Sequence, residues 1–540
     1  MGDTRQASRL RDFHHPGRSP VYATHGMAAT SMPVATLAAV DVLRGGGNAV
    51  DAAVAAAAVL AVVEPHSTGI GGDCFCLYKP AGGAVVALNG SGRAPAGASL
   101  EGLRAAGYVT PDLRSPHTVT VPGAVGAWQA LLDAHGTRGF GELLRPAIGY
   151  AEEGFAVTPR VSADWAAEVD KLRAQGTASF LPGGVAPVPG DVFRQPALGR
   201  TLRRIAERGA AGFYEGEVAA GIVATLRARG GLHTEEDFAE GLGAAMFVDP
   251  ISAEWQGHRV WECPPNGSGL VVLMILGILE ALGPAPDGPL GAIRLHRHIE
   301  AARLAFRDRD AFVADPSQVE VPVARLLDKA YLASLAGLID DRRAMPAMPL
   351  AGEALLPRHR DTVYLSVVDR DGNACSFINS LFMSFGSGIL AEESGVMLHN
   401  RGFGFRLEEG HPNCIAPRKR PMHTILPAML TQAGEAVMSF GVMGGHFQPM
   451  GQSLLLSNVL EHGLDVQQAI DLPRLFPFAG KVEVERGVPE AVVTRLAEMG
   501  HAPERLEVPH GGAQAIWIDR GRGVLVGGSE PRKDGLALGY

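Results

Sequence analysis

The alternation of apolar and polar positions predicts a chain of mixed helices and strands. Residues 49–63 form an apolar run interrupted only by Asp51, and their length and alanine content predict a buried helix. Helical spacing also predicts helices over much of residues 122–240 and at 293–310. Short apolar runs predict strands, which we place at residues 74–78, 84–88, 247–255, 260–263, 428–430 and 436–442.

Residues 361–381 carry the strongest strand pattern. Asp371-Gly372 stands between two arms rich in β-branched and aromatic residues, which is typical of a β-hairpin. In one interpretation the loop has three residues, 370–372, with Gly372 in the left-handed conformation. In the other, Asp371-Gly372 is a two-residue loop, and the pairing of the arms shifts by one residue.

The loop length decides which side chain lies opposite Thr362. A three-residue loop pairs Asp369 with Asn373, and counting outward along both arms then places Thr362 opposite Ser380. Two hydroxyl groups would lie within hydrogen-bonding reach on one face of the sheet. The two-residue loop would place Leu381 there instead. The pattern alone also fits an ordinary hairpin with a threonine at the start of a strand.

Three stretches are predicted to lie outside regular structure. Residues 1–25 are polar and resemble a flexible arm, and residues 339–360 are rich in Pro, Met and Ala without periodicity, which indicates a surface loop or linker. Residues 64–73 form a glycine-rich turn into a strand. Their glycine spacing is not that of a dinucleotide-binding loop, and no helix follows.

Composition narrows the classes of function. The 540 residues have a net charge of −9 and no basic block, so nucleic acid and anionic membranes are poor partners. We see no apolar run of signal-peptide or membrane-spanning length, and we expect a cytoplasmic protein. The motifs G-x-S-x-G and G-x-x-x-x-G-K-[ST] are absent, which argues against a serine hydrolase of that type and a P-loop enzyme.

No metal or other cofactor is expected. His296 and Glu300 share one face of a predicted helix, but two ligands do not make a metal site, and a solvated or packing face explains them. The five cysteines are odd in number and scattered, so we expect reduced, small core residues: Cys74, Cys76, Cys263, Cys375 and Cys414.

Asp361-Thr362, followed by the run Ser366 to Ala374, resembles the processing site of the gamma-glutamyltranspeptidase family of N-terminal-nucleophile hydrolases. The resemblance extends over nearly the whole chain, from Gly26 to Tyr540. It implies a four-layer αββα sandwich of the α+β class. It also implies self-cleavage before Thr362 into a large subunit, residues 1–361, and a small subunit, residues 362–540, which form one intertwined domain.

The resemblance also assigns chemistry. Thr362 would be the nucleophile once cleavage frees its α-amino group, which can act as its base, and Ser380 would support it. Gly444 and Gly445, at a predicted strand-to-helix junction, would supply backbone N–H groups to an oxyanion hole. Without the resemblance, these two glycines would be interpreted as a simple strand terminator.

Some substrate-binding positions depart from the family's transpeptidases. In the transpeptidases, an asparagine, a glutamine and an aspartate bind the substrate's α-amino group. The corresponding residues here are Phe382, Arg401 and Gly404. A pair of serines that contacts the α-carboxylate is replaced by His423 and Thr424.

The family's carboxylate-binding arginine also has no direct counterpart. Its position is Ser91 here, and Arg93 is the nearest arginine. An ammonium-binding pocket has thus lost acceptors and gained Arg401, which could bind a carboxylate or pair with Glu392 or Glu393 of the protein itself.

This pattern is similar to the acylase and amidohydrolase branch, which includes glutaryl-cephalosporin acylases and oxamate amidohydrolase. We therefore predict an amidohydrolase for amides of small, carboxylate-bearing acyl groups. The alternatives are a gamma-glutamyltransferase or glutathione hydrolase, and a non-catalytic homologue. The expected partners are a small-molecule amide and, after cleavage, the two subunits for each other, with homodimer formation left open.

Overall fold

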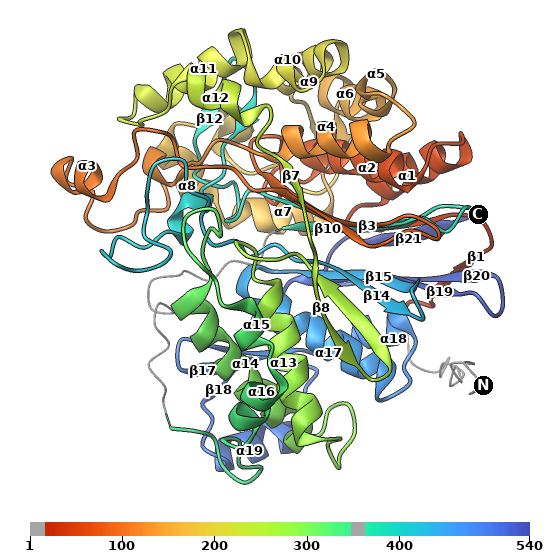
Figure 1. The fold of residues 1–540 in the computed structure, drawn as a ribbon. Helices are drawn as coiled ribbons and strands as arrows, with labels where there is room; N and C mark the ends of the chain where they lie inside the picture. The colour runs from red at the N-terminus through yellow and green to blue at the C-terminus, as the bar shows by residue number, and fades with distance from the viewer. Residues whose placement is uncertain (1–16, 347–361) are drawn as a thin grey trace.

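The computed structural model describes residues 17–346 and 362–540, and its centre is a pair of seven-stranded sheets packed face to face (Figure 1). The first sheet has the order β1 (Val21–Ala23), β20 (Val524–Ser529), β19 (Gly512–Asp519), β15 (Glu435–Met443), β14 (Pro427–Gln432), β9 (His258–Glu262) and β8 (Ile251–Trp255). The second has the order β21 (Leu536–Gly539), β2 (Met27–Thr30), β10 (Val363–Val368), β11 (Ala374–Ser380), β3 (Asp73–Lys79), β4 (Val86–Gly90) and β7 (Met246–Val248).

Helices cover the outer face of each sheet (Figure 1). The second sheet is covered by a layer that includes α1 (Pro33–Arg44), α2 (Ala49–Val63), α4 (Ala124–His135), α5 (Phe140–Leu143), α6 (Arg145–Glu153) and α9 (Pro196–Arg208). The first sheet is covered by a layer that includes α13 (Gly269–Leu282), α14 (Ala292–Phe312), α16 (Lys329–Ala336), α17 (Gln448–Leu460) and α18 (Val466–Asp471).

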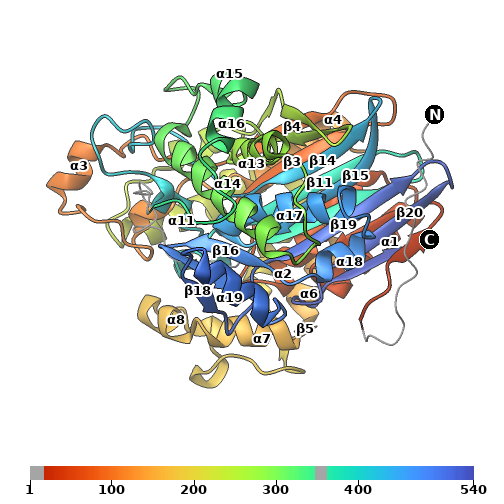
Figure 2. The same cartoon turned by 90° about the horizontal axis from the view of Figure 1, so that it is seen from below.

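Smaller elements surround these layers, and Figure 2 shows several of them from below. The remaining helices are α3 (Leu100–Ala105), α7 (Pro159–Ala166), α8 (Val169–Gln175), α10 (Ala211–Tyr214), α11 (Glu217–Arg227), α12 (Glu235–Gly241), α15 (Val323–Leu326) and α19 (Glu490–Glu498). In the described part of the chain, three small sheets comprise β5 (Phe155–Ala156) with β6 (Val192–Phe193), β12 (Leu390–Ala391) with β13 (Val396–Met397), and β16 (Leu475–Phe478), β17 (Lys481–Val484) and β18 (Pro503–Arg505).

Three large apolar clusters fill the spaces between the layers. One joins α1 and α2 to the second sheet, and another joins α13, α14 and α17 to the first sheet. The third lies between the sheets and includes Phe75, Tyr364 and Ile516. Burial of these faces is the main favourable term in folding. The predicted four-layer αββα sandwich is therefore confirmed.

The buried helix α2 shows how the sequence specifies these elements. All fifteen of its residues are buried, including Asp51. Asn48 and Asp51 form a capping box at its start, and the Asp51 carboxylate also accepts hydrogen bonds from the Thr137 N–H at 2.9 Å and its hydroxyl at 2.5 Å. The charge in the apolar run is thus a fully partnered cap.

Two local predictions differ from the structure, and a third is decided between its alternatives. The strand expected near residues 247–255 is two strands in different sheets, β7 and β8, because Pro250 interrupts it. Part of the expected flexible arm, Val21–Ala23, pairs with β20 as an edge strand, while residues 1–16 lie outside the described residues. His296 and Glu300 are fully buried, so of the two alternatives for their face of α14 the packing face is confirmed and the solvated face is wrong.

Both sheets combine strands from before and after Thr362. The first sheet takes β1, β8 and β9 from before this residue, and the second sheet takes β10, β11 and β21 from after it. A cut before Thr362 would therefore leave two interlocked chains. Within residues 17–346 and 362–540, no helix combines the length and the apolar character needed to cross a membrane.

Candidate active site

Thr362 and Ser380 lie opposite each other at the ends of β10 and β11. Thr362 Oγ1 is 3.1 Å from Ser380 Oγ, and both side chains are buried. The hairpin loop sets this register: the Asp369 N–H donates to the Asn373 carbonyl at 3.1 Å, and Gly372 has a φ of 86°. The three-residue loop is confirmed, and the two-residue alternative is wrong.

The glycine-rich turn before β3 packs directly behind this pair. A Cβ atom on Gly72 would lie 2.3 Å from the Ser380 carbonyl oxygen, so only glycine allows this approach. The neighbouring Asn379 side chain donates to Thr68 Oγ1 at 2.8 Å and to the Gly69 carbonyl at 3.2 Å. The turn therefore fixes the end of β11 by backbone contact and by hydrogen bonds.

Arg401 is linked to the hydroxyl pair through Phe382, and its charge is buried. Ser380 Oγ accepts a hydrogen bond from the Phe382 N–H at 2.9 Å, and the Phe382 ring lies 4.3 Å from the Arg401 guanidinium carbon. Arg401 Nη1 donates to Thr424 Oγ1 at 2.8 Å. The Arg401 side chain is 0% exposed, yet its Nε and Nη2 groups have no hydrogen-bond partner among the described residues.

Arg401 also has no carboxylate partner within ion-pair distance in the described part of the chain, so its predicted alternative pairing is wrong. Glu392 instead accepts a hydrogen bond from Ser179 at 3.0 Å, and Glu393 is exposed. Burial lowers the pKa of Arg401 to about 9, against the opposing charge of Asp73. The guanidinium therefore remains protonated at neutral pH, although burying an unpaired charge is costly.

Asp73, the first residue of β3, connects the surrounding loops. Its Oδ1 accepts the N–H groups of Gly92 at 3.0 Å and Gly123 at 3.1 Å, and its Oδ2 lies 3.0 Å from His423 Nε2. Burial raises the pKa of Asp73, but His399, the hydrogen bond to His423 and the charge of Arg401 together bring it to about 2. Asp73 is thus ionised and holds together the loops that carry Gly92, Gly123 and His423.

His423 has protein partners at both ring nitrogens. Its Nε2 faces Asp73, and its Nδ1 accepts the Ile425 N–H at 3.4 Å, so both ring nitrogens face protein partners. Burial and the charge of Arg401 lower the pKa of His423 to about 3. The ring is therefore neutral at ordinary pH and serves to orient the segment that carries Thr424.

Arg93 stands in a different environment from Arg401. Its Nη1 donates to the Arg418 carbonyl at 2.8 Å and lies 4.0 Å from Asp315, and the side chain is 31% exposed. It lines a cavity of about 320 Å³ with Asp237 and other residues. Because protein groups already engage Arg93, it is the weaker candidate for binding a substrate carboxylate.

Two contacts between the sheets show how β10 and β15 face each other. Ser366 Oγ donates to Ser439 Oγ at 2.6 Å, and a Cβ atom on Gly441 would lie 2.3 Å from the Tyr364 ring. Ser366 thus faces Ser439 and Tyr364 faces Gly441, so the two strands run in opposite directions. This relation indicates that Thr362, just before β10, lies near the end of β15.

The turn at that end of β15 is Gly444-Gly445. Both glycines have left-handed φ values, 119° and 56°, and a Cβ atom on Gly444 would lie 2.8 Å from the Gly511 Cα atom. The Phe447 N–H donates to the Gly444 carbonyl at 3.1 Å. This hydrogen bond of the turn therefore does not occupy the N–H group of Gly444 or of Gly445. These N–H groups precede α17, where the helix dipole also favours negative charge.

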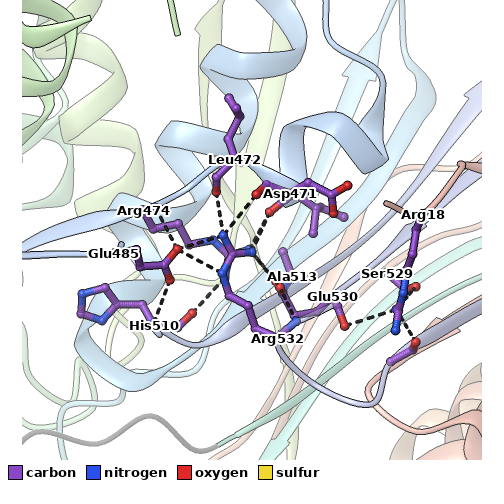
Figure 3. Close-up of polar contacts among 12 residues, drawn as sticks. Arg18, Asp471, Leu472, Arg474, Glu485, His510, Ala513, Ser529, Glu530 and Arg532 are labelled. Atoms are coloured by element: carbon purple, nitrogen blue, oxygen red, sulfur yellow. Dashed lines mark hydrogen bonds and ion pairs between the residues drawn. The ribbon is translucent and has the colours of Figure 1, made fainter. Parts of the chain in front are cut away.

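A buried ionic network holds the loop behind this turn (Figure 3). Glu530 binds Arg474 and also Arg532, the latter at 2.9 Å, and it accepts the Ala513 N–H at 2.8 Å. Arg474 donates to the His510 carbonyl at 2.9 Å. His510 immediately precedes Gly511, so the network fixes the backbone against which Gly444 packs.

The structure brings in residues that the sequence analysis did not single out. Arg309 Nη1 lies 2.9 Å from Nδ1 of His446, the residue after Gly445, and forms an ion pair with Asp310 at 2.7 Å. Arg309 and Asp310 line a cavity of about 250 Å³ that also reaches Gly404. Among Asp73, Arg309, Asp310 and His446, only Asp73 could have been noticed in the sequence, because it is a charged residue at the start of an apolar strand.

Comparison with known proteins extends this picture over the whole chain. The family model described as gamma-glutamyltranspeptidase matches residues 35–540. An oxamate amidohydrolase proenzyme of Klebsiella pneumoniae is 36% identical over 534 residues, which cover 96% of this chain and 99% of that protein. A glutathione hydrolase-like YwrD proenzyme of Bacillus subtilis is also 36% identical, with the same coverage.

A solved structure agrees in fold. The crystal structure of a cephalosporin acylase from Bacillus halodurans superposes with a TM-score of 0.90 and 39% identity, covering 98% of each chain. These similarities and the αββα architecture mark the chain as an enzyme of the N-terminal-nucleophile hydrolase type. The chain belongs to the gamma-glutamyltranspeptidase family, close to its acylase and amidohydrolase members.

Proposed function

We propose that this chain is a self-processing amidohydrolase that cleaves amides of small acyl groups bearing a second carboxylate. The observation that carries the proposal is Arg401, a fully buried guanidinium with two N–H groups that have no partner among the described residues. Three contacts connect it to the nucleophile, because Arg401 stacks on Phe382, Phe382 donates to Ser380, and Ser380 lies against Thr362.

The first reaction is cleavage of the chain itself. The Thr362 hydroxyl attacks the carbonyl of Asp361, a residue outside the described range, and the acyl group moves from nitrogen to oxygen. Water then hydrolyses this ester and leaves Thr362 with a free α-amino group. Such an amine has a pKa of about 8 and can accept the proton of the adjacent hydroxyl.

The second reaction uses the same hydroxyl on a substrate amide. Thr362 Oγ1 forms a bond to the substrate carbonyl carbon, the C–N bond breaks, and the amine leaves with a proton. Ser380 Oγ, at 3.1 Å, can donate a hydrogen bond to Thr362 Oγ1 or accept one from it. Water then hydrolyses the threonyl ester. The N–H groups of Gly444 and Gly445 stabilise the tetrahedral oxyanion, at roughly 3 kcal/mol per donor.

The acyl group is selected by charge. Phe382 offers an apolar ring and Gly404 offers no side chain, so neither side chain can accept hydrogen bonds from an ammonium group. Arg401 would repel an ammonium and can bind a carboxylate through its Nε and Nη2 groups, with Nη1 already oriented by Thr424. This contact would supply the partner that the buried charge otherwise lacks.

Kinetics on a matched set of anilides test this assignment. Glutaryl and γ-glutamyl anilides differ by one α-amino group, and a pentanoyl anilide replaces the distal carboxylate by a methyl group. We expect the wild type to prefer glutaryl, and Arg401→Ala to raise KM for glutaryl by about 10- to 100-fold, because a charge-assisted contact is lost. The KM for pentanoyl should change little.

Two further variants make the result interpretable. Arg93→Ala is the matched control, since it removes an arginine that already has protein partners. Arg401→Lys keeps the buried charge but loses the two-pronged geometry, and it serves if Arg401→Ala does not fold. Preference for γ-glutamyl over glutaryl in the wild type would instead make the enzyme a glutathione hydrolase or gamma-glutamyltransferase.

A further inference from the structure

Away from the nucleophile, two histidines and a glutamate point toward one another. One ligand atom from each of His296, Glu300 and His501 lies within 4.8 Å of the other two. His296 and Glu300 stand one helical turn apart on α14, and His501 follows α19, which packs against α14. The sequence supplied only the first two residues, and packing adds the third.

Hydrogen bonds fix the chemistry of the His296 ring. Its Nε2 lies 3.0 Å from the Asp340 carbonyl oxygen, which can only accept, so Nε2 carries the proton. In the neutral ring, Nδ1 then presents a lone pair, and it lies 2.7 Å from His501 Nε2. A ligand histidine that donates its other N–H to a backbone carbonyl is the usual arrangement around protein-bound metals.

Glu300 is held in a comparable way. Its Oε1 accepts from Arg303 at 2.7 Å, and its Oε2 accepts from the Met345 N–H at 2.7 Å. Each carboxylate oxygen has two acceptor positions, so one on each remains open. The backbone N–H of His501 donates to the Leu496 carbonyl of α19 at 3.1 Å, which positions the residue.

We propose that His296 Nδ1, His501 Nε2 and Glu300 form a binding site for Zn²⁺ or a similar divalent transition metal. Two imidazole nitrogens and one carboxylate favour such ions over Mg²⁺ and Ca²⁺, which prefer oxygen ligands. Water would complete a tetrahedral site. On binding, the His501 proton moves from Nε2 to Nδ1, so both imidazoles stay neutral and both lone pairs face the ion.

The geometry requires only a small adjustment. Two nitrogens bound to one tetrahedral Zn²⁺ lie about 3.3 Å apart, compared with the 2.7 Å between His296 and His501 here. His501 is half-buried and follows Gly500, so its ring can move outward. The Arg303 charge beside Glu300 weakens attraction for a dication, and we therefore expect micromolar rather than tighter affinity.

The position of the site suggests its role. His296 and Glu300 precede Thr362 in the chain and His501 follows it, so an ion would join the two segments that self-cleavage separates. It would also hold residues 340–345, which contact the site through the Asp340 carbonyl and the Met345 N–H. This role rests on the proposed cleavage, whereas metal binding itself does not.

Titration of the untagged full-length protein with Zn²⁺ tests the site. After treatment with a chelator, calorimetry should show one Zn²⁺ per chain, and Co²⁺ should give the visible absorption bands of a tetrahedral site with nitrogen and oxygen ligands. His501→Ala and Glu300→Gln should each weaken binding by roughly 100-fold. The second variant keeps an acceptor for the Met345 N–H and so guards against a folding defect.

His258→Ala is the matched control. His258 is a half-buried histidine whose Nδ1 lies 2.8 Å from the Gln256 carbonyl oxygen, a contact within its own hairpin. This variant should bind Zn²⁺ as the wild type does, and Zn²⁺ should raise the melting temperature of both. The proposal is overturned if the wild type binds no Zn²⁺, or if His501→Ala and Glu300→Gln bind it unchanged. Neither result bears on the amidohydrolase assignment.

Discussion

Thr362 Oγ1 and Ser380 Oγ lie 3.1 Å apart on neighbouring antiparallel strands, buried from solvent. Ser380 Oγ also accepts the Phe382 N–H, at 2.9 Å. Its hydroxyl can still donate to Thr362 Oγ1 or accept from it. This arrangement connects the proposed nucleophile to Phe382, whose ring packs against Arg401.

Replacing Ser380 by alanine should slow both chain cleavage and substrate turnover, by about 10²-fold or less, because one hydrogen bond is lost. Time-resolved intact mass measures the first rate, and initial rates on the processed enzyme measure the second. Ser376→Ala is the matched control, since Ser376 is a buried serine of the same strand that bonds Tyr364 at 2.8 Å. It should affect stability only. Equal rates in wild type and Ser380→Ala would refute the role of this pair.

Replacing Thr362 by alanine should leave a single uncut chain of 540 residues, because no hydroxyl remains to attack the preceding carbonyl. Thr362→Ser keeps the hydroxyl and should still be cut. Intact mass spectrometry of the wild type should show two fragments whose boundary lies between residues 361 and 362. A cut at any other bond, or a processed alanine variant, would exclude Thr362 as the self-cleaving residue.

Replacing Gly444 by alanine should lower kcat by roughly 10²- to 10³-fold, the usual effect of losing an oxyanion donor. The added Cβ would lie 2.8 Å from the Gly511 Cα atom, on a residue with φ of 119°, so the turn must shift. The ionic network of Arg474, Glu530 and Arg532 holds the backbone next to Gly511, so Gly511 cannot easily move away. Steady-state kinetics with a processed sample measure the loss.

Gly434→Ala provides the control for strain alone. Gly434 has a φ of 83° in the turn between β14 and β15, and a Cβ atom there would meet nothing within 4 Å. This variant should lose about 1–2 kcal/mol of stability through its backbone conformation and keep full activity. If Gly444→Ala behaves in the same way, the Gly444 N–H is not an oxyanion donor.

Acid should destabilise the fold partly through His233. Burial lowers the pKa of this histidine to about 4, and one ring nitrogen lies 3.0 Å from the Val119 carbonyl. The pKa of histidine in the unfolded chain is about 6.5. As the pH falls below this value, the unfolded chain binds a proton that the native His233 ring does not bind, so the free energy of unfolding declines until about pH 4. The contribution lost by pH 5 is about 2 kcal/mol.

Urea unfolding of wild type and His233→Gln at pH 7.5 and pH 5 measures this effect. Glutamine does not titrate, so the stability of the variant should fall less between the two pH values, by about 2 kcal/mol. Substitution of His25, which is exposed, should leave the pH dependence as in the wild type. An identical pH dependence in His233→Gln and wild type would contradict the assignment.

The sequence alone determined most of the elements and narrowed the residue opposite Thr362 to two alternatives, Ser380 or Leu381. The helix expected at residues 49–63 is α2, and the structure selected the expected three-residue loop, whose turn at Gly372 brings Thr362 to Ser380. The glycine turn after β15 was also visible. These features depend on near neighbours in the chain, through the periods of helices and strands and the conformational freedom of glycine.

Tertiary structure alone decided which distant groups meet. Asp73 reaches His423 across 350 residues, and His501 joins His296 across 205. The buried state of Arg401 could not be read from the pattern either, because an arginine in a loop is normally exposed. Such contacts arise from the packing of layers drawn from separate parts of the chain, and local periodicity carries no information about them.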